Sequence, residues 1–123
     1  SNPIGFRPGT TTYADSIAEA IEYINVHFHS ELCLDDVLRH IGMSRSSFSR
    51  QFSQYTGQNF TEFLQRVRLE HCRRLLTARG HKITEAALES GFHNLSHFNR
   101  LFRQRWGMTP RQFVESLDIG DEG

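Results

Sequence analysis

The chain has 123 residues, the usual size of one domain, and its hydrophobic fraction of 37% is ordinary for a globular protein. No apolar run approaches the roughly 18 residues that a membrane-spanning helix needs, and the first twenty residues do not resemble a signal peptide, so we expect a cytoplasmic protein. The 14 basic and 14 acidic side chains cancel, so the net charge by itself neither indicates nor excludes a nucleic-acid partner.

The charges are unevenly distributed along the chain. Residues 1–44 carry two bases and six acids, whereas residues 45–117 carry twelve bases and five acids, and residues 118–123 carry three acids. Eleven of the twelve bases in the middle segment are arginines, whose planar guanidinium suits phosphate and guanine. A nucleic-acid interface and an ordinary charged helical surface both account for this pattern.

Three helices are predicted in the first half of the chain. Residues 1–12 hold turn formers without apolar periodicity, so we expect a tail or linker there. Apolar residues at the spacing of one helical face then predict a first helix, and these residues are Ala14, Ile17, Ala18, Ile21, Ile24 and Phe28. A short helix is expected over 34–41, and a third helix is expected from the N-cap Ser44 to about Thr56.

A long helix is predicted next, beginning at the cap Asn59 and closing at Gly80. Some twenty residues at 1.5 Å each give it a length of about 30 Å. Its expected buried stripe is Phe60, Phe63, Leu64, Val67, Cys72, Leu75 and Leu76. Three more helices are predicted over about 83–90, from Asn94 to before Gly107, and from Thr109-Pro110 to about 117. Residues 118–123 are predicted to be a disordered tail.

Residues of the third predicted helix and those after it recur fifty positions later. The repeated pairs are Phe48 and Phe98, Arg50 and Arg100, Phe52 and Phe102, Gly57 and Gly107, and Phe63 and Phe113. A short helix, a glycine turn and a longer helix form a helix-turn-helix unit, here present twice. Within each unit the two phenylalanines, four residues apart, face the core, and the arginine between them faces away.

No segment alternates like a strand, so the fold class is predicted to be all-α with about seven helices. We expect two helix-turn-helix subdomains, at residues 13–57 and 81–117, joined by a long linker helix at 58–80. A helix of that length would hold two reading helices about one turn of DNA apart.

The segment SGFHNLSHFNRLFRQRWGMTPRQF, residues 90–113, resembles the signature of the AraC/XylS family of bacterial transcription regulators. The family pattern is G-F-x-x-x-S-x-F-x-R-x-F, a spacer, then G-x-T-P. The matching residues are Gly91, Phe92, Ser96, Phe98, Arg100, Phe102, Gly107, Thr109 and Pro110. Segments 41–52 and 66–76 are also similar to the family, so the likeness covers about 14–117.

Two positions depart from the family pattern. Phe113-Val114 stands where the family often has Tyr-Arg, which would cost one phosphate contact. Cys33 stands where the family often has serine, which would cost a helix cap.

The resemblance implies that the third and sixth helices enter successive major grooves of promoter DNA. By matching positions, the candidate contacts are Arg45, Ser46, Ser49 and Arg50 on the first reading helix and Asn94, Leu95, Ser96, His97, Asn99, Arg100 and Arg103 on the second. Arg50 and Arg100 have the best physical case, because a bidentate arginine discriminates guanine by about 1–3 kcal/mol. For Leu95 a thymine-methyl contact and ordinary packing are both open, and Ser96 is expected at a phosphate or in a hydrogen bond at the helix start.

The remaining cationic side chains are assigned less specifically. Phosphates flanking the groove are expected to meet Arg103, Arg105 and Arg111. The DNA backbone and solvent are both open for the arginines of the linker helix, Arg66, Arg68, Arg73, Arg74 and Arg79. His93 and His97 are interpreted as plain exposed histidines, with phosphate or base contact as the alternative.

Aromatic and metal-binding alternatives are weaker. The helical spacing of the phenylalanines and Trp106 predicts that they pack in the core. The alternative is that they stack on the bases of a single-stranded nucleic acid. Cys72 lies beside His71, but no ligands cluster around the pair, so no metal or cofactor is expected.

The sequence therefore predicts a sequence-specific, double-stranded DNA-binding transcription regulator. The alternative is a helical protein-interaction module whose Arg-rich face binds an acidic partner; the duplicated motif favours DNA. An enzyme is not expected, because there is no phosphate loop, paired-carboxylate pocket or Cys-His nucleophile. The resemblance also implies a regulator that works with RNA polymerase, with an activator expected and a repressor left open, and a separate sensing or dimerising domain, which would make this chain a fragment.

Overall fold

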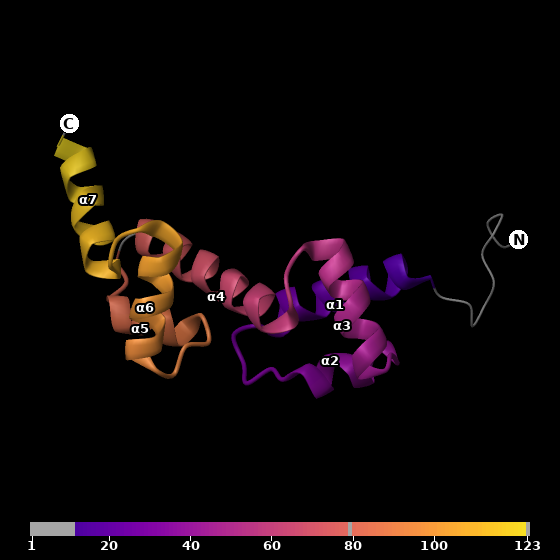
Figure 1. Ribbon diagram of the computed structural model, residues 1–123. Helices are drawn as coiled ribbons and strands as arrows, with labels where there is room; N and C mark the ends of the chain where they lie inside the picture. The colour runs from indigo at the N-terminus through magenta and orange to yellow at the C-terminus, as the bar shows by residue number, and fades with distance from the viewer. Residues whose placement is uncertain (1–11, 79, 123) are drawn as a thin grey trace, which may run out of the picture. The chain divides into compact units, whose positions relative to one another are not determined.

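The computed structural model describes residues 12–78 and 80–122, and their side chains as far as Leu117. This part of the chain is all-α and forms seven helices (Figure 1), as the sequence predicted. They are α1 (Tyr13–His27), α2 (Leu34–Ile41), α3 (Arg45–Thr56), α4 (Phe60–Thr77), α5 (Ile83–Glu89), α6 (Leu95–Trp106) and α7 (Pro110–Glu122). The tail predicted at 1–12 lies outside the described residues except for Thr12, whose hydroxyl accepts the backbone N–H of Asp15 and caps α1.

The chain divides into two compact units. The first holds the described residues up to His27 together with Leu32–Phe63, and the second holds Phe28–Glu31 and the residues from Leu64 onward. The helix α4 is therefore shared: its first turn belongs to the first unit and the remainder to the second. The sequence predicted a linker helix at 58–80 between subdomains at 13–57 and 81–117.

In the first unit, α1 packs against both α2 and α3. The buried apolar side chains are Ile17, Ala20, Ile24, Val37, Phe48, Phe52 and Phe63. Phe52 stacks on Phe48 and meets the ring of Phe63 edge-on, at centroid distances of 4.9 and 5.2 Å. The buried face of α1 differs from the predicted one, since Ala14 and Ala18 are exposed and Ser16 and Ala20 are buried.

In the second unit, α6 contacts α5 and α7. One core cluster holds Leu69, Cys72, Leu76, Ala86, Ala87, Phe92, Phe98 and Phe102, with Leu75, Ile83, Leu101, Trp106, Phe113 and Val114 packed against it. The rings of Phe102 and Trp106 meet edge-on at 4.5 Å. Trp106 and the buried phenylalanines of this unit thus pack in its core, as their spacing predicted.

The buried stripe of α4 changes face along the helix. Phe63 and Leu64 are buried near its start, and Leu69, Cys72 and Leu76 are buried further along. The sequence missed Leu69, because the predicted stripe assumed that one face is buried throughout. A helix that serves one core and then a second one has no single buried face.

The turn between α5 and α6 needs a glycine. Gly91 has φ +100°, and a Cβ added there would lie 2.7 Å from the carbonyl oxygen of Phe28 and 2.7 Å from Nε of Arg68. Both the backbone conformation and the space therefore exclude a larger residue.

The helix α7 runs to Glu122, whereas the sequence predicted a disordered tail from residue 118. No proline follows Pro110, and the single Gly120 costs a helix only about 1 kcal/mol. These residues therefore contain no strong stop, and the helical hydrogen bonding continues through them.

Candidate nucleic-acid interface

The helix α3 presents its candidate residues on the face opposite its core. Ser44 caps it as predicted, with its hydroxyl accepting the backbone N–H of Ser47 at 3.3 Å. Phe48 and Phe52 are buried, whereas Ser46, Ser49 and Arg50 are exposed, as is Arg45. Among the described residues, the structure gives the Arg50 side chain no hydrogen-bond or ion-pair partner.

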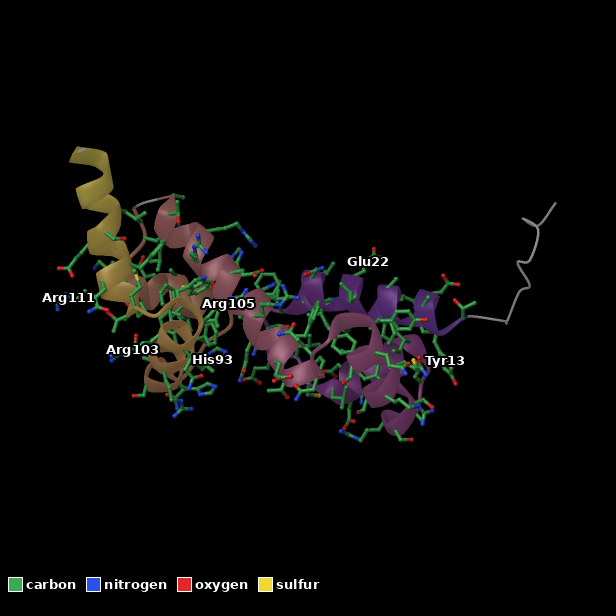
Figure 2. The ribbon with its side chains drawn as sticks, turned by 45° about the horizontal axis from the view of Figure 1, so that its top comes forward. Tyr13, Glu22, His93, Arg103, Arg105 and Arg111 are labelled. Carbon is green, nitrogen blue, oxygen red and sulfur yellow. The ribbon has the colours of Figure 1, made fainter. Side chains whose placement is uncertain are left out.

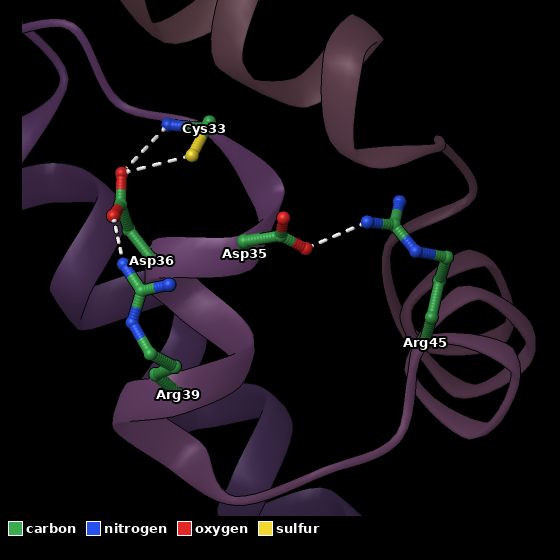
Figure 3. Close-up of polar contacts among 5 residues, drawn as sticks. All are labelled: Cys33, Asp35, Asp36, Arg39 and Arg45. Carbon is green, nitrogen blue, oxygen red and sulfur yellow. Dashed lines mark hydrogen bonds and ion pairs between the residues drawn. The ribbon is translucent and has the colours of Figure 1, made fainter.

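Arg45 already has an anionic partner in the first unit. Its Nη2 lies 2.6 Å from Oδ1 of Asp35 on α2, and both side chains are well exposed, at 61% and 59% (Figure 3). An exposed pair of this kind contributes about 0–1 kcal/mol to folding. The contact is therefore weak enough for a phosphate to replace the carboxylate.

The start of α2, which carries Asp35, is held by a second carboxylate (Figure 3). The backbone N–H and the thiol of Cys33 both donate to Oδ2 of Asp36, at 3.0 and 3.1 Å, and Arg39 pairs with its Oδ1 at 2.6 Å. The hydrogen bonds from Cys33 and then the charge of Arg39 hold the pKa of Asp36 below its ordinary value, although partial desolvation opposes them. Cys33 thus occupies the N-cap position without itself accepting a cap hydrogen bond, and Asp36 supplies the bond to the backbone.

The helix α6 repeats the arrangement of α3. Asn94 is its N-cap, and its side-chain oxygen accepts the backbone N–H of His97 at 2.9 Å. The buried residues are again two phenylalanines four apart, Phe98 and Phe102. The exposed candidates are Asn94, Leu95, Ser96, Asn99, Arg100 and Arg103, with Leu95 exposed to 43%. The hydrogen bond at the helix start, which the sequence left open for Ser96, is made by Asn94.

His97 is half-buried and in contact with two side chains, which differs from the plain exposed histidine that was predicted. Its Nδ1 lies 2.7 Å from Nη2 of Arg100, and its Nε2 lies 3.4 Å from Nε2 of Gln65 on α4. The guanidinium of Arg100 is therefore held by a contact with the His97 side chain, whereas that of Arg50 has no such contact with a described residue.

The other arginines of the second unit fall into two groups. Arg103 and Arg111, labelled in Figure 2, are exposed, and the phosphate contacts expected of them stay a prediction. Arg105 pairs instead with Glu70 on α4 at 2.8 Å and lies 5.5 Å from the centre of the Trp106 ring. The phosphate contact predicted for Arg105 thus competes with an ion pair inside the unit.

Arg68 is half-buried and its guanidinium bonds to the backbone of its own unit. Its Nε donates to the carbonyl of Phe28 at 2.7 Å and its Nη2 donates to the carbonyl of Ser30 at 2.8 Å. Burial lowers the pKa of its guanidinium. Arg68 therefore holds the segment Phe28–Ser30 against α4, a role that the sequence did not predict; Arg79, predicted in the same group, lies outside the described residues.

The Cys72 and His71 pair does not resemble a metal site. Cys72 is fully buried, and burial raises the pKa of its thiol to about 12, so the sulfur stays protonated. No group of three or more His, Cys, Asp or Glu side chains that would hold a metal occurs within 12–78 and 80–117. In the described part of the chain, no helix has both the length and the apolar character needed to cross a bilayer.

Two residues that matter to the candidate interface escaped the sequence analysis. Neither Asp35 nor Gln65 was assigned to the interface from the sequence. Each acts through a side chain ten or more positions away, Arg45 and His97. No local pattern signals such a pair, because it arises only when separate helices pack.

Comparisons with known proteins agree with this geometry. Residues 37–116 match the family described as "Helix-turn-helix domain". An uncharacterised HTH-type transcriptional regulator of Staphylococcus aureus (strain MSSA476) is 34% identical over 99 residues, which are 80% of this chain but only 13% of that protein.

Several solved structures are similar to this chain, among them the following two. The DNA-binding domain of the global transcriptional factor AdpA, solved in complex with a target DNA, has a TM-score of 0.78 and 25% identity, covering 82% of this chain and 91% of its own. A transcriptional regulator from Chromobacterium violaceum, described as AraC-type, has a TM-score of 0.77 and 27% identity, covering 83% and 91%.

Proposed function

Because the chain belongs to the AraC-type helix-turn-helix family, we propose that it is a sequence-specific, double-stranded DNA-binding regulator of transcription. In this proposal α3 and α6 are the two reading helices, and each enters the major groove. One observation carries it: in both helices a pair of buried phenylalanines turns an exposed arginine, Arg50 or Arg100, away from the core. An arginine so placed is suited to a guanine edge.

The proposed contacts divide by chemistry. Base edges are assigned to Arg50 and Arg100, with Asn99 suited to adenine. Phosphates are assigned to Arg45, Arg103 and Arg111 at the ends of the reading helices and beside them. The remaining candidates are small or apolar and border the groove, where they allow close approach; they are Ser46, Ser49, Asn94, Leu95 and Ser96.

The experiment is selection of bound sequences from a random duplex library, followed by the same selection with Arg50→Ala and Arg100→Ala. We expect the unmodified chain to select a defined sequence, and each variant to lose preference in a different part of it by about 1–3 kcal/mol per contacted base pair. Arg74→Ala is the matched control, because it removes an exposed arginine from α4 and leaves both reading helices intact. A chain that selects no sequence, but binds an acidic protein, would support the protein-interaction alternative.

Further proposals rest on the family resemblance. We propose that the chain acts without catalysis in the bacterial cytoplasm, that RNA polymerase is a partner, and that a separate sensing or dimerising domain works with it. A transcription assay with purified RNA polymerase tests that partnership, because the chain should then change the amount of transcript made from its promoter. The chain spans about an eighth of the length of the Staphylococcus aureus relative. The activities of a whole regulator are therefore proposals for this chain.

A further inference from the structure

The two reading helices differ in how they hold their arginine. The position three residues before Arg100 is His97, and the corresponding position before Arg50 is Ser47. His97 contacts Arg100 at 2.7 Å, whereas Arg50 has no side-chain partner among the residues that the structure describes. The duplication therefore preserved the arginine and changed its support.

The hydrogen bond to Arg100 indicates which ring nitrogen of His97 carries the hydrogen. A guanidinium only donates, so Nδ1 of His97 must be an unprotonated acceptor for Arg100, and the ring hydrogen lies on Nε2. That N–H needs an acceptor, and the neighbouring group is the amide of Gln65, 3.4 Å away. The amide nitrogen of Gln65 faces Nε2 in the structure, and turning the amide by 180° would place its oxygen there as the acceptor.

The support reaches Arg100 from a different helix. Gln65 lies on α4 and His97 and Arg100 lie on α6, and all three belong to the second unit. Gln65 and His97 are half-buried, whereas Arg100 is exposed. The buried end of this chain of contacts is thus anchored in the unit, and its exposed end is the group that would meet a base.

We propose that His97, oriented by Gln65, is a positioning residue that fixes the Arg100 guanidinium for base recognition. The inference rests on the proposed function, since it assigns a specificity role within the same interface. A free arginine loses rotamer freedom when it binds, and a side chain held in place beforehand loses less. The half of the DNA site under α6 should therefore be read more stringently than the half under α3.

The test uses two amide substitutions that separate the two ring nitrogens. His97→Asn places an oxygen near the position of Nδ1, which keeps the acceptor for Arg100, whereas His97→Gln reaches the position of Nε2 and loses that acceptor. Base preference is measured by selection from a random duplex library, alongside Arg100→Ala and Gln65→Leu. Ser47→Ala, at the corresponding position of α3, is the control.

We expect His97→Gln and His97→Ala to weaken preference by about 2- to 10-fold at the base pairs that Arg100→Ala affects, and nowhere else. His97→Asn should retain most of the preference, Gln65→Leu should lose part of it, and Ser47→Ala should leave the Arg100-dependent base pairs unchanged. Thermal unfolding of each variant identifies any that do not fold, and the two amide variants carry the test if His97→Ala is among them.

Three results would overturn the inference. Unchanged preference in His97→Gln would show that the contact does not position Arg100, and equal loss in both amide variants would show that the acceptor is irrelevant. An Arg100→Ala variant with unaltered preference would remove the residue being positioned, while the unmodified chain's own selectivity would still support the proposed function. A chain that selects no sequence would instead reject the proposed function itself.

Discussion

The Arg45 and Asp35 pair shows how a single carboxylate tunes a candidate phosphate contact. Both side chains are exposed, so the pair adds little to folding, but it occupies the guanidinium and places a negative charge at the start of α3. A DNA phosphate would therefore compete with Asp35 for the Arg45 guanidinium.

Asp35→Asn should therefore tighten DNA binding while leaving the free energy of unfolding within about 0.5 kcal/mol. The slope of log affinity against log salt should steepen by about 0.9 if Arg45 gains one phosphate contact. Titration of a labelled duplex at several salt concentrations measures both quantities. The control is Glu22→Gln on α1 (labelled in Figure 2), which also removes one negative charge but at a residue that is not paired with Arg45. An equal gain in affinity for that variant would indicate an effect of net charge alone.

His71 makes the stability of the chain sensitive to pH. Burial lowers its pKa, and the charges of Arg74 and His29 lower it further, whereas Glu89 opposes them. The folded protein thus binds this proton less readily than the unfolded chain does. The contribution of His71 is full above its ordinary pKa of about 6.5, and it is lost as the pH falls below that value and through the lower pKa of the folded state.

Denaturant unfolding at pH values from 8 to 5 should show the unmodified chain losing more stability on acidification than His71→Gln, which cannot be protonated. Parallel curves for the two proteins would mean that His71 takes no part. His93→Gln, at an exposed histidine of the same unit, serves as the control.

The turn before α6 requires glycine at position 91, because there is no space for a side chain. At Gly91 a Cβ meets the Phe28 carbonyl and Arg68, whereas at Gly107 nothing lies within 4 Å of the same atom, although φ is +73° there. Comparing the two positions separates the cost of a positive φ from the cost of a steric clash.

Gly107→Ala should lower the free energy of unfolding by about 1 kcal/mol, the usual cost of a left-handed backbone for alanine. Gly91→Ala should cost more, by a further 1–3 kcal/mol or so, because the backbone carbonyl cannot move away as a flexible side chain would. Urea unfolding of both variants gives the comparison. Equal losses would indicate that the Phe28–Ser30 segment yields freely and that Arg68 does not hold it.

The elements themselves were largely predictable from sequence. The caps Ser44 and Asn59 were predicted from local signals, and each makes the expected hydrogen bond. Asn94 and Thr109 cap α6 and α7 in the same way. The exposed positions of Arg50 and Arg100 also followed from the spacing of the phenylalanines. Whether these arginines contact DNA stays a prediction.

What the sequence missed concerns packing between helices. Arg68 was assigned to solvent or DNA, and it bonds to two carbonyls nearly forty positions earlier. The buried faces of α1 and α4 differ from the predicted faces for a related reason. Which face of a helix is buried depends on the helices that pack against it. Helical periodicity records that a face is apolar, but it does not record what covers it.

At the scale of the whole molecule, the chain builds two cores of the same plan. Phe52 and Phe102 are fully buried at corresponding positions, one in each unit, and each contacts aromatic rings of its own unit. Regions with separate cores open with separate free energies.

Phe52→Leu should therefore accelerate amide hydrogen exchange in α1, α2 and α3, and Phe102→Leu should do so in α5, α6 and α7. Exchange followed by mass spectrometry on peptides from each unit measures this directly, with each variant as the control for the other. Faster exchange in all helices for either substitution would mean that the two units unfold as one.

The sharing of α4 by the two units sets a rule for changing its length. One inserted residue rotates everything beyond it by about 100° and advances it by about 1.5 Å, so a single insertion would turn α6 away from its original bearing. Seven inserted residues restore the bearing to within about 20° and add about 10 Å, close to three base pairs of B-DNA. Three base pairs also turn the duplex by about 100°, so if α3 and α6 read DNA as proposed, a chain lengthened by a heptad would match neither the original operator nor one whose half-sites lie three base pairs further apart.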